Sequence, residues 1–334
     1  MYRICLNLFL LLFLNPAARA QEIRMLNKGQ TVSLRGLSVV SDQVVWVSGS
    51  GGTVGLSANG GETWKWMHVA GHEHADFRDI EAFSDREAVI MGITEPAILM
   101  RTTDGGNSWT SVFEDTVKSA FLDAMDFSGN QGLVIGDPEN GKILIARSAD
   151  RGKSWEQPVS SGLDTTDAGE AFFAASGSNI GHLPGNNWVL VSGGKKSNLY
   201  IANNRYPLLI NQGGETTGAN SIAINPSDSN QAFVVGGDFS HDSLRYGNSL
   251  RIQFHPFTQT KPPKPPRGYR SCVEWLDEKR MICCGTSGVD ISKDGGMHWK
   301  GISDISFHIC RKAKSGQTVF LAGAHGAIAR LKWD

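Results

Sequence analysis

The side chains best suited to bind a ligand are arginines that stand near the start of short apolar runs, namely Arg35, Arg78 and Arg270. A guanidinium binds a carboxylate or another anion through paired hydrogen bonds, so a group of arginines predicts an anion site. Alignment of seven run starts puts seven residues in equivalent positions, which we expect to surround the mouth of one central channel: Arg35, Arg78, Leu122, Glu170, Asn220, Arg270 and Phe307. We therefore select Arg35, Arg78, Glu170 and Arg270 as the ligand-binding residues.

Two other interpretations of these side chains stay open. Glu170 is a catalytic alternative, because glycoside hydrolysis needs paired carboxyl groups and other acids are expected on the same face. The arginines could instead pair with acids such as Asp79 and Glu81 and line a solvated channel. Our preferred hypothesis assigns no catalytic residue.

A loop with two histidines and an aspartate, His72, His74 and Asp76, contains side chains that can bind a metal ion. Solvated loop histidines give the same pattern, so we expect no metal here. The chain has no Walker sequence and no G-x-G-x-x-G between a strand and a helix. We expect no cofactor.

The elements that position these residues are indicated by a repeated octad, S/T-x-D-x-G-x-S/T-W. The octad ends at Trp64, Trp109, Trp155 and Trp299, and its acidic or amide position is occupied by Asn59, Asp104, Asp150 and Asp294. An Asp or Asn that accepts hydrogen bonds from nearby amides, followed by a glycine, is typical of a tight turn. The tryptophan would anchor the returning strand by burying its ring. We interpret these eight residues as structural.

The spacing of the octads predicts the fold. The intervals from Trp64 to Trp109 and from Trp109 to Trp155 are 45 and 46 residues, and Trp299 follows after 144 residues, or three intervals of 48. A period near 45 is typical of one four-stranded propeller blade. Seven apolar runs that end in glycine supply seven second strands. The sequence therefore predicts an all-β, seven-bladed propeller of antiparallel blades.

The first and last strands should meet in one blade. The last blade ends after its third strand at residues 327–333, and residues 22–27 can supply the fourth strand. This overlap would close the ring and leave no free sheet edge. Connections between blades, and between second and third strands, should lie on one face, here called the upper face. The octad turns should lie on the opposite, lower face.

Residues 1–20 are interpreted as a secretory signal peptide, cut before Gln21, because a basic start precedes an apolar run and an Ala-x-Ala site. Residues 21–334 would then form a single propeller domain in the periplasm or outside the cell. The run is too short to span a membrane. A formal net charge of −1 gives no support for nucleic acid as a partner. Export allows a disulfide among Cys272, Cys283, Cys284 and Cys310, and buried free thiols are the other possibility.

The octad resembles the Asp-box, or BNR repeat, of sialidase-like propellers. Sialidases use an arginine triad on a substrate carboxylate, but they have six blades, and here the nearest match to their Arg motif is Phe77-Arg78-Asp79-Ile80, without proline. Over the whole mature chain the sequence is more similar to photosystem II stability/assembly factor-like propellers. That resemblance implies a seven-bladed chaperone with arginines around one channel face, which binds a partner polypeptide. Leu122, Glu170, Asn220 and Phe307 depart from a full arginine patch.

Three hypotheses for function follow from these patterns. The preferred one is an exported, monomeric, non-catalytic propeller that recognises a protein, a glycan or another anionic ligand on its upper face. The alternative is a sialidase-like or other glycan-processing hydrolase that uses Glu170. A third is a scaffold in an envelope assembly.

Overall fold

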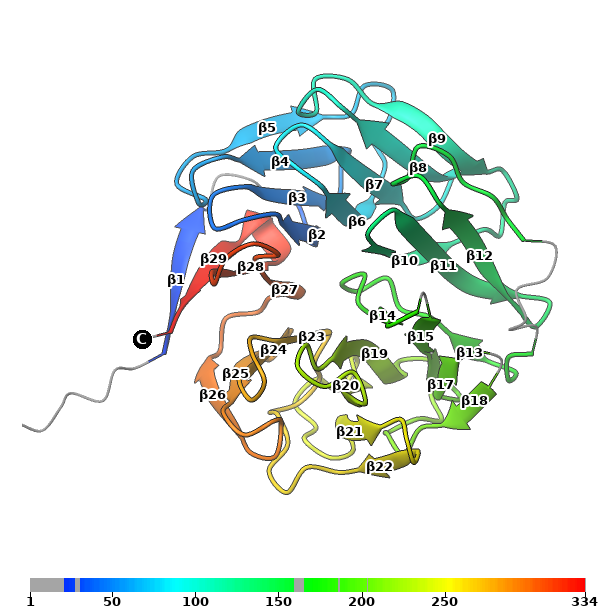
Figure 1. Cartoon of the computed structure of the whole chain (residues 1–334), viewed down its shortest axis with the longest axis vertical. Helices are drawn as coiled ribbons and strands as arrows, with labels where there is room; N and C mark the ends of the chain where they lie inside the picture. Colours follow the sequence, from blue (N-terminus) through cyan, green and yellow to red (C-terminus); the bar gives the residue numbers. More distant parts are fainter. Residues whose placement is uncertain (1–20, 28–30, 159–164, 186, 203, 334) are drawn as a thin grey trace, which may run out of the picture.

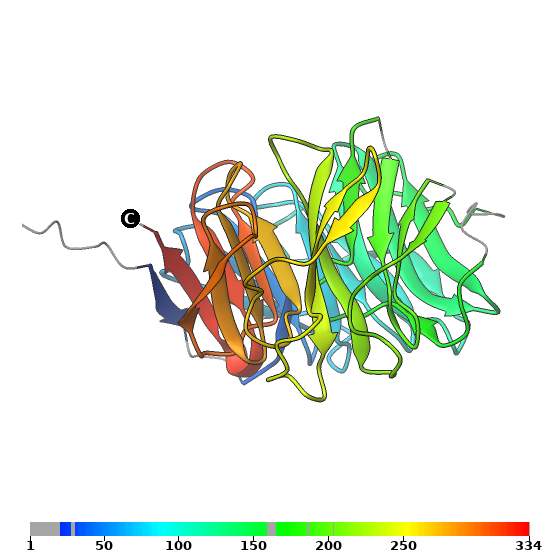
Figure 2. The ribbon, with the colours of Figure 1, turned by 90° about the horizontal axis from the view of Figure 1, so that it is seen from below.

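The computed structural model describes residues 21–27, 31–158, 165–185, 187–202 and 204–333. The expected signal peptide lies outside the described residues. The described chain folds into seven antiparallel sheets arranged in a ring around a central channel (Figure 1). Seen from the side, the ring is a disc with loops on two faces (Figure 2). The prediction of an all-β, seven-bladed propeller is confirmed.

Each blade is a meander whose first strand faces the channel. Blades 1 to 3 consist of β2 (Leu34–Val39), β3 (Val45–Gly49), β4 (Thr53–Ser57) and β5 (Lys65–His68); β6 (Phe77–Ala82), β7 (Ala88–Gly92), β8 (Ala97–Thr102) and β9 (Thr110–Asp115); and β10 (Leu122–Ser128), β11 (Gln131–Glu139) and β12 (Lys142–Ser148). In blade 3 a bridge between Arg147 and Glu156 stands where a fourth strand would lie.

Blades 4 to 6 consist of β14 (Ile180–Leu183), β15 (Asn187–Val191), β17 (Asn198–Ile201) and β18 (Asn204–Pro207); β19 (Thr217–Ile224), β20 (Gln231–Asp238), β21 (Ser249–Gln253) and β22 (Thr258–Thr260); and β23 (Cys272–Trp275), β24 (Met281–Gly285), β25 (Gly288–Ser292) and β26 (Trp299–Ser303). Two short strands, β13 (Glu170–Ala171) and β16 (Gly193–Gly194), extend the sheet of blade 5. The seven predicted second strands correspond to β3, β7, β11, β15, β20, β24 and β28.

Blade 7 contains both ends of the described chain. Its strands are β27 (Ile309–Lys312), β28 (Val319–Ala322) and β29 (Ile328–Lys332), with a 3-10 turn at Ala324–Gly326. The N-terminal strand β1 (Glu22–Asn27) pairs with β29, from Glu22 opposite Lys332 to Asn27 opposite Ile328. The register agrees with the predicted ring closure, and the paired strands are adjacent in Figure 1.

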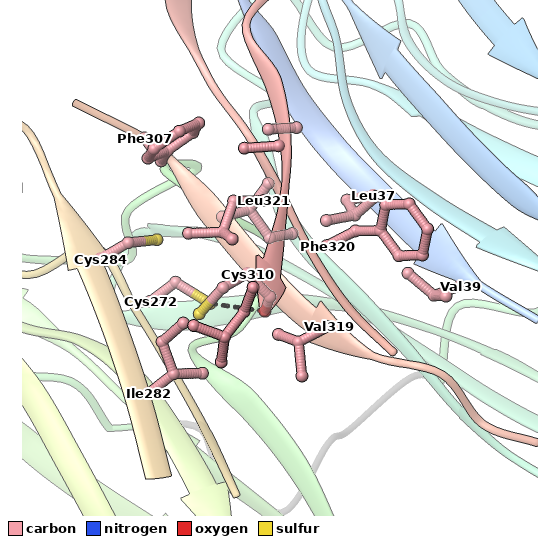
Figure 3. Packing of buried hydrophobic residues seen from close by; sticks show 14 of the residues in the cluster. Leu37, Val39, Cys272, Ile282, Cys284, Phe307, Cys310, Val319, Phe320 and Leu321 are labelled. Carbon is pink, nitrogen blue, oxygen red and sulfur yellow. Dashed lines mark hydrogen bonds between the residues drawn. The ribbon is translucent and has the colours of Figure 1, made fainter. Parts of the chain in front are cut away.

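A continuous apolar cluster holds blades 6, 7 and 1 together at this closure (Figure 3). It includes Cys272, Cys284 and Cys310. These three cysteines and Cys283, which lies outside the cluster, are free thiols without exposed surface. Cys272 lies directly opposite Cys284 in the sheet. Burying this surface stabilises the closure, at which the four described cysteines form no disulfide.

The four octads form the same turn. In the copy that ends at Trp109, the Thr102 hydroxyl accepts the Gly106 amide at 3.0 Å, and Asp104 Oδ1 accepts the Ser108 amide at 3.0 Å. The Ser108 hydroxyl also donates to Asp104 at 2.6 Å, and these bonds hold the pKa of Asp104 well below its usual range. Gly106 has φ +78°, and an added Cβ would stand 2.7 Å from a sulfur of blade 1, so glycine is required there.

The octad tryptophans differ in burial. Trp299 is 2% exposed, whereas Trp64, Trp109 and Trp155 are half-buried. Trp109 packs edge-on against Trp46 of blade 1, with ring centroids 6.3 Å apart. The rings therefore seal the crevices between strands and blades at the lower face more than they fill the core.

None of the helical segments among the described residues is long and apolar enough to cross a bilayer.

Candidate functional site

The upper end of the channel is closed by a segment of the chain itself. Residues 172–179, here called the crossing segment, leave β13 and pass through the channel before β14 begins. Their contacts reach five other blades. Two carbonyl groups of the segment accept arginine side chains, Ala175 O from Arg35 Nη1 and Ser176 O from Arg311 Nη2, both at 3.3 Å. Two of its hydroxyls donate at 2.8 Å, Ser176 Oγ to Ser271 O and Ser178 Oγ to Ser221 Oγ, and Gly177 lies against Asp79. The expected mouth of the central channel is therefore closed by the chain itself.

Two of the predicted arginines do meet above this segment. Arg35 and Arg78 are the bulge residues of β2 and β6, where one extra residue interrupts the pairing and turns its side chain toward the axis. Arg78 Nε donates to Asp76 at 2.8 Å, and both side chains are 27% exposed. Among the described residues, the terminal nitrogens of Arg78 have no hydrogen-bond partner, and Arg35 uses Nη1 alone.

The two guanidinium groups are close enough to repel each other. Burial, and then the charge of Arg78, lower the pKa of Arg35. His308 beside them is 8% exposed, and burial together with the two arginines lowers its pKa to about 3. Asp76 is the acid that offsets this charge for Arg35. The upper site thus has unused N–H donors on two neighbouring guanidinium groups, which can bind an anion.

In three blades, the residue that we expected at the channel mouth is wrong by one position, and the next residue in the sequence lies there instead. In blade 3 the bulge falls on Asp123, because Leu122 pairs with Gly136 inside the sheet. In blades 6 and 7 the amides of Arg270 and Phe307 bond the preceding blade, as that of Leu34 does in blade 1. Their successors, Ser271 and His308, therefore take the axial positions. The prediction was correct for Asn220, the bulge residue of β19.

Arg270 is a buried structural residue in this arrangement. It has no exposed surface and pairs with Asp290, whose side chain is 1% exposed. Arg270 Nη1 also donates to Tyr269 O and Ser287 Oγ, both at 2.7 Å. The placement of Arg270 at the channel mouth is wrong, because the sheet begins one residue later than the apolar pattern indicated.

Glu170 does not begin blade 4 either. That blade begins at Ile180, and Glu170 lies in β13, which pairs with β16. The Glu170 carboxylate accepts hydrogen bonds from the Ser192 and Tyr200 hydroxyls and from the Asp167 amide, and the residue is 6% exposed. Its acceptor capacity is used within the protein, so the position neither faces the arginines nor offers a free carboxylate.

The histidine loop is organised by hydrogen bonds of its own. The amide of His72 donates to Val69 O, and Asp76 bonds Arg78 instead of facing His74. Within the described ranges, no group of three or more His, Cys, Asp or Glu side chains could hold a metal ion.

Asp123 is a site residue that the sequence pattern did not reveal. It has no exposed surface, and neither carboxylate oxygen has a hydrogen-bond partner among the described residues. Burial, and then the nearby Asp137, raise the pKa of Asp123, while Arg78 opposes that effect. The only sequence signal was its place after an apolar residue at a run start.

Large exposed apolar side chains occur on loops of the upper face. Every large hydrophobic residue with substantial exposure in the described chain lies in a connection between blades or between second and third strands: Val117, Leu209, Phe239, Leu244, Tyr246 and Ile305, at 43 to 82% exposure. Phe239 packs edge-on against Tyr269, with ring centroids 6.1 Å apart. Tyr269 is close enough to Arg35 for the charge of that arginine to act on its pKa. Phe239, Leu244 and Tyr246 share the loop between β20 and β21, and several exposed apolar side chains in one place are typical of a contact site for a partner.

Comparisons with known proteins agree with the fold. No protein-family model matches the chain. The photosystem II stability/assembly factor HCF136, chloroplastic, from Oryza sativa subsp. japonica is 26% identical over 160 residues, which cover 45% of this chain and 37% of that protein. The match therefore spans little more than a third of the length of that curated relative.

Three solved structures share the architecture. "YCF48 bound to D1 peptide" has a TM-score of 0.67 at 18% identity and covers 94% of this chain and 97% of that one. YCF48 from Cyanidioschyzon merolae has a TM-score of 0.66 at 16% identity, over 92% and 98% of the two chains. The WD40 β-propeller domain of Doa1 has a TM-score of 0.66 at 12% identity, over 94% and 98%. At these identities the likeness establishes the fold alone.

Proposed function

We propose that this chain is a non-catalytic propeller that binds an extended polypeptide on its upper face. The observation that carries the proposal is that the exposed large apolar side chains stand on loops of the upper face, the face on which Arg35 and Arg78 lie. Apolar loops supply contact area, and the unused guanidinium N–H groups supply recognition of a carboxylate. A polypeptide with an acidic group beside apolar side chains meets both requirements.

The named relatives support this class of function. One is a stability/assembly factor, and one solved propeller of the same fold is bound to a peptide. The peptide in that structure is the ligand of that protein; what the proposal takes from it is the class of ligand. A cleaved signal peptide, export and a monomeric state remain part of the proposal.

The hydrolase alternative has less support. A general acid or nucleophile must reach the substrate, but Glu170 is 6% exposed and its carboxylate has three donors from within the protein. Sialidases use three arginines, but here two of the predicted arginines lie on the upper face. The third, Arg270, is buried and pairs with Asp290.

A synthetic peptide array tests the proposal. Short peptides would vary independently in carboxylate content and in aromatic or aliphatic content, and binding of the purified chain would be measured by fluorescence. Arg78→Ala should weaken binding of the acidic peptides about tenfold, which is the loss of one charge-assisted hydrogen-bonded contact. Tyr246→Ser should weaken acidic and neutral apolar peptides alike.

The matched control is Arg86→Ala, which removes an exposed arginine from the lower-face hairpin between β6 and β7. It should leave peptide binding unchanged. Equal losses in Arg78→Ala and Arg86→Ala would show nonspecific charge attraction and would overturn the proposal.

A further inference from the structure

The octad turns seal crevices between neighbouring blades at the lower face. In each octad the fifth residue is a glycine at positive φ, and an added Cβ would stand 2.3 to 2.8 Å from a side chain of the preceding blade. These glycines and the side chains that they contact are Gly61 and Leu26, Gly106 and Met67, Gly152 and Val89, and Gly296 and Phe233. Blades 4 and 5 carry no octad between their third and fourth strands. The crevice between these two blades therefore lacks this seal.

A pocket of about 620 Å³ lies in the crevice between blades 4 and 5, which are neighbours in the ring (Figure 1). It is lined by lower-face turns of both blades, those after β14 and β17 in blade 4 and those after β19 and β21 in blade 5. The Asn230 side chain holds the turn after β21 on its own blade, because it accepts the His255 amide at 2.7 Å and donates to His255 O at 3.0 Å. The volume is within the range of about 300–1,000 Å³ that is typical of small-ligand sites.

The pocket combines aromatic rings with an uncharged lining. Among the described residues that line it, none is Asp, Glu, Lys or Arg. The half-buried rings of Tyr206 and Phe257 stack with their centroids 4.1 Å apart. Leu183, Ile201 and Phe254 add further apolar surface. Because this lining offers no ion pair to an anionic or a cationic ligand, it favours a neutral one.

Uncommitted polar groups stand beside these rings. Asn204 and Ser229 are exposed, and their side chains form no hydrogen bond among the described residues. Asn187 donates from Nδ2 to Pro184 O at 3.2 Å, which leaves its side-chain oxygen as an acceptor. Amide and hydroxyl groups together supply donors and acceptors, so the pocket complements a ligand that carries hydroxyl groups.

We propose that this pocket binds a neutral saccharide. A sugar ring presents C–H groups on its faces, which pack against the rings of Tyr206 and Phe257. It presents hydroxyls at its edge, which form hydrogen bonds with the free amide and hydroxyl groups of the pocket. The pocket lies on the lower face, opposite to the face that we propose to bind a polypeptide, so the two proposals are independent.

An array of neutral, sialylated and sulfated glycans, probed with the fluorescently labelled mature chain, tests this proposal. Saturable binding to neutral glycans is the expected result, and isothermal titration calorimetry of the best-bound free oligosaccharide then gives its affinity. Asn204→Ala should weaken that affinity about tenfold, because the ligand loses its hydrogen bonds to one amide. Ser229→Trp should abolish binding, because the new ring would fill the pocket from its exposed rim.

Asn130→Ala is the matched control, since Asn130 is an exposed asparagine in a lower-face hairpin of blade 3 and outside this pocket. It should leave the affinity unchanged, and both pocket variants should melt at the temperature of the unsubstituted chain. Absence of binding to neutral glycans, binding confined to charged glycans, or equal losses in Asn204→Ala and Asn130→Ala would overturn the proposal. Loss of peptide binding in Ser229→Trp, without any glycan binding, would instead assign the pocket to an apolar segment of a polypeptide.

Discussion

The two ends of the channel are built by the same seven strands and yet differ in how their charged side chains are paired. At the upper end, Arg35 and Arg78 keep unused donors beside exposed apolar loops. At the lower end, basic and acidic side chains stand together: Lys314 donates to Glu81, and Arg311 stands 3.9 Å from Glu274. The difference depends on the crossing segment, which divides the channel and takes a hydrogen bond from Arg35 on one side and Arg311 on the other. A blocked propeller channel can thus provide two chemically distinct surfaces.

The largest expected effect separates structural from ligand-facing arginines. Arg270→Met should lower the free energy of unfolding by about 3–5 kcal/mol, because it leaves Asp290 buried with part of its charge uncompensated. Arg78→Met should lower it by less, about 1 kcal/mol, since its ion pair is partly exposed to solvent. Urea denaturation measures both. Similar losses would mean that Arg78 is as structural as Arg270, and the upper site would lose its main donor.

A second substitution tests the crossing segment as a divider. Gly177 has φ +60°, and an added Cβ would stand 2.0 Å from Asp79 Oδ2. Gly177→Ala should therefore destabilise the fold by about 3 kcal/mol, combining backbone strain with a steric clash. Gly129→Ala is the matched control, because Gly129 has φ +61° and no atom within 4 Å of the added Cβ. This control variant should lower the free energy of unfolding by about 1 kcal/mol, from backbone strain alone. Equal thermal shifts would show that the segment is loosely packed.

The last contrast is the opposite pH dependence of the two ends. The folded-state pKa of His308, about 3, is below its ordinary value of 6.5, so its contribution to stability is lost as pH falls from about 6.5 toward 3. The folded-state pKa of Glu274, about 7, is above its ordinary value of 4.5, so its contribution is lost as pH rises from about 4.5 through 7. Each proton changes stability by at most about 1.4 kcal/mol per pH unit.

Urea denaturation at several pH values separates the two contributions. His308→Gln should flatten the acid side of the stability profile, and Glu274→Gln should flatten the neutral side. A profile unchanged by either substitution would remove the electrostatic contrast between the two ends.

The fold was predictable because it depends on local signals that repeat. The octads ending at Trp64, Trp109, Trp155 and Trp299 mark turns, and the glycine-ended runs mark second strands, so spacing alone indicates the blades. The site was predictable only in part. Arg35 and Arg78 were found because their bulges coincide with the apolar run starts.

The remaining ring positions could not be predicted from the apolar pattern. A bulge adds one residue without changing that pattern, so Asp123 and His308 were each missed by one position. Residues 170–173 resemble an inner strand in composition, but Phe172 leads into the crossing segment, and long-range contacts determine that path. The exposed apolar residues are dispersed among four loops that only the folded ring brings to one face.

The measurement that tests the central claim most directly is photo-crosslinking of a short acidic peptide that carries a benzophenone, followed by mass spectrometry of the cross-linked sites. The claim that the upper face binds polypeptides predicts cross-links at residues 239–246 and near Leu209 and Ile305, lost when unlabelled peptide competes. Competed cross-links that fall instead on the lower-face hairpins, such as residues 84–86 or 277–280, would contradict it.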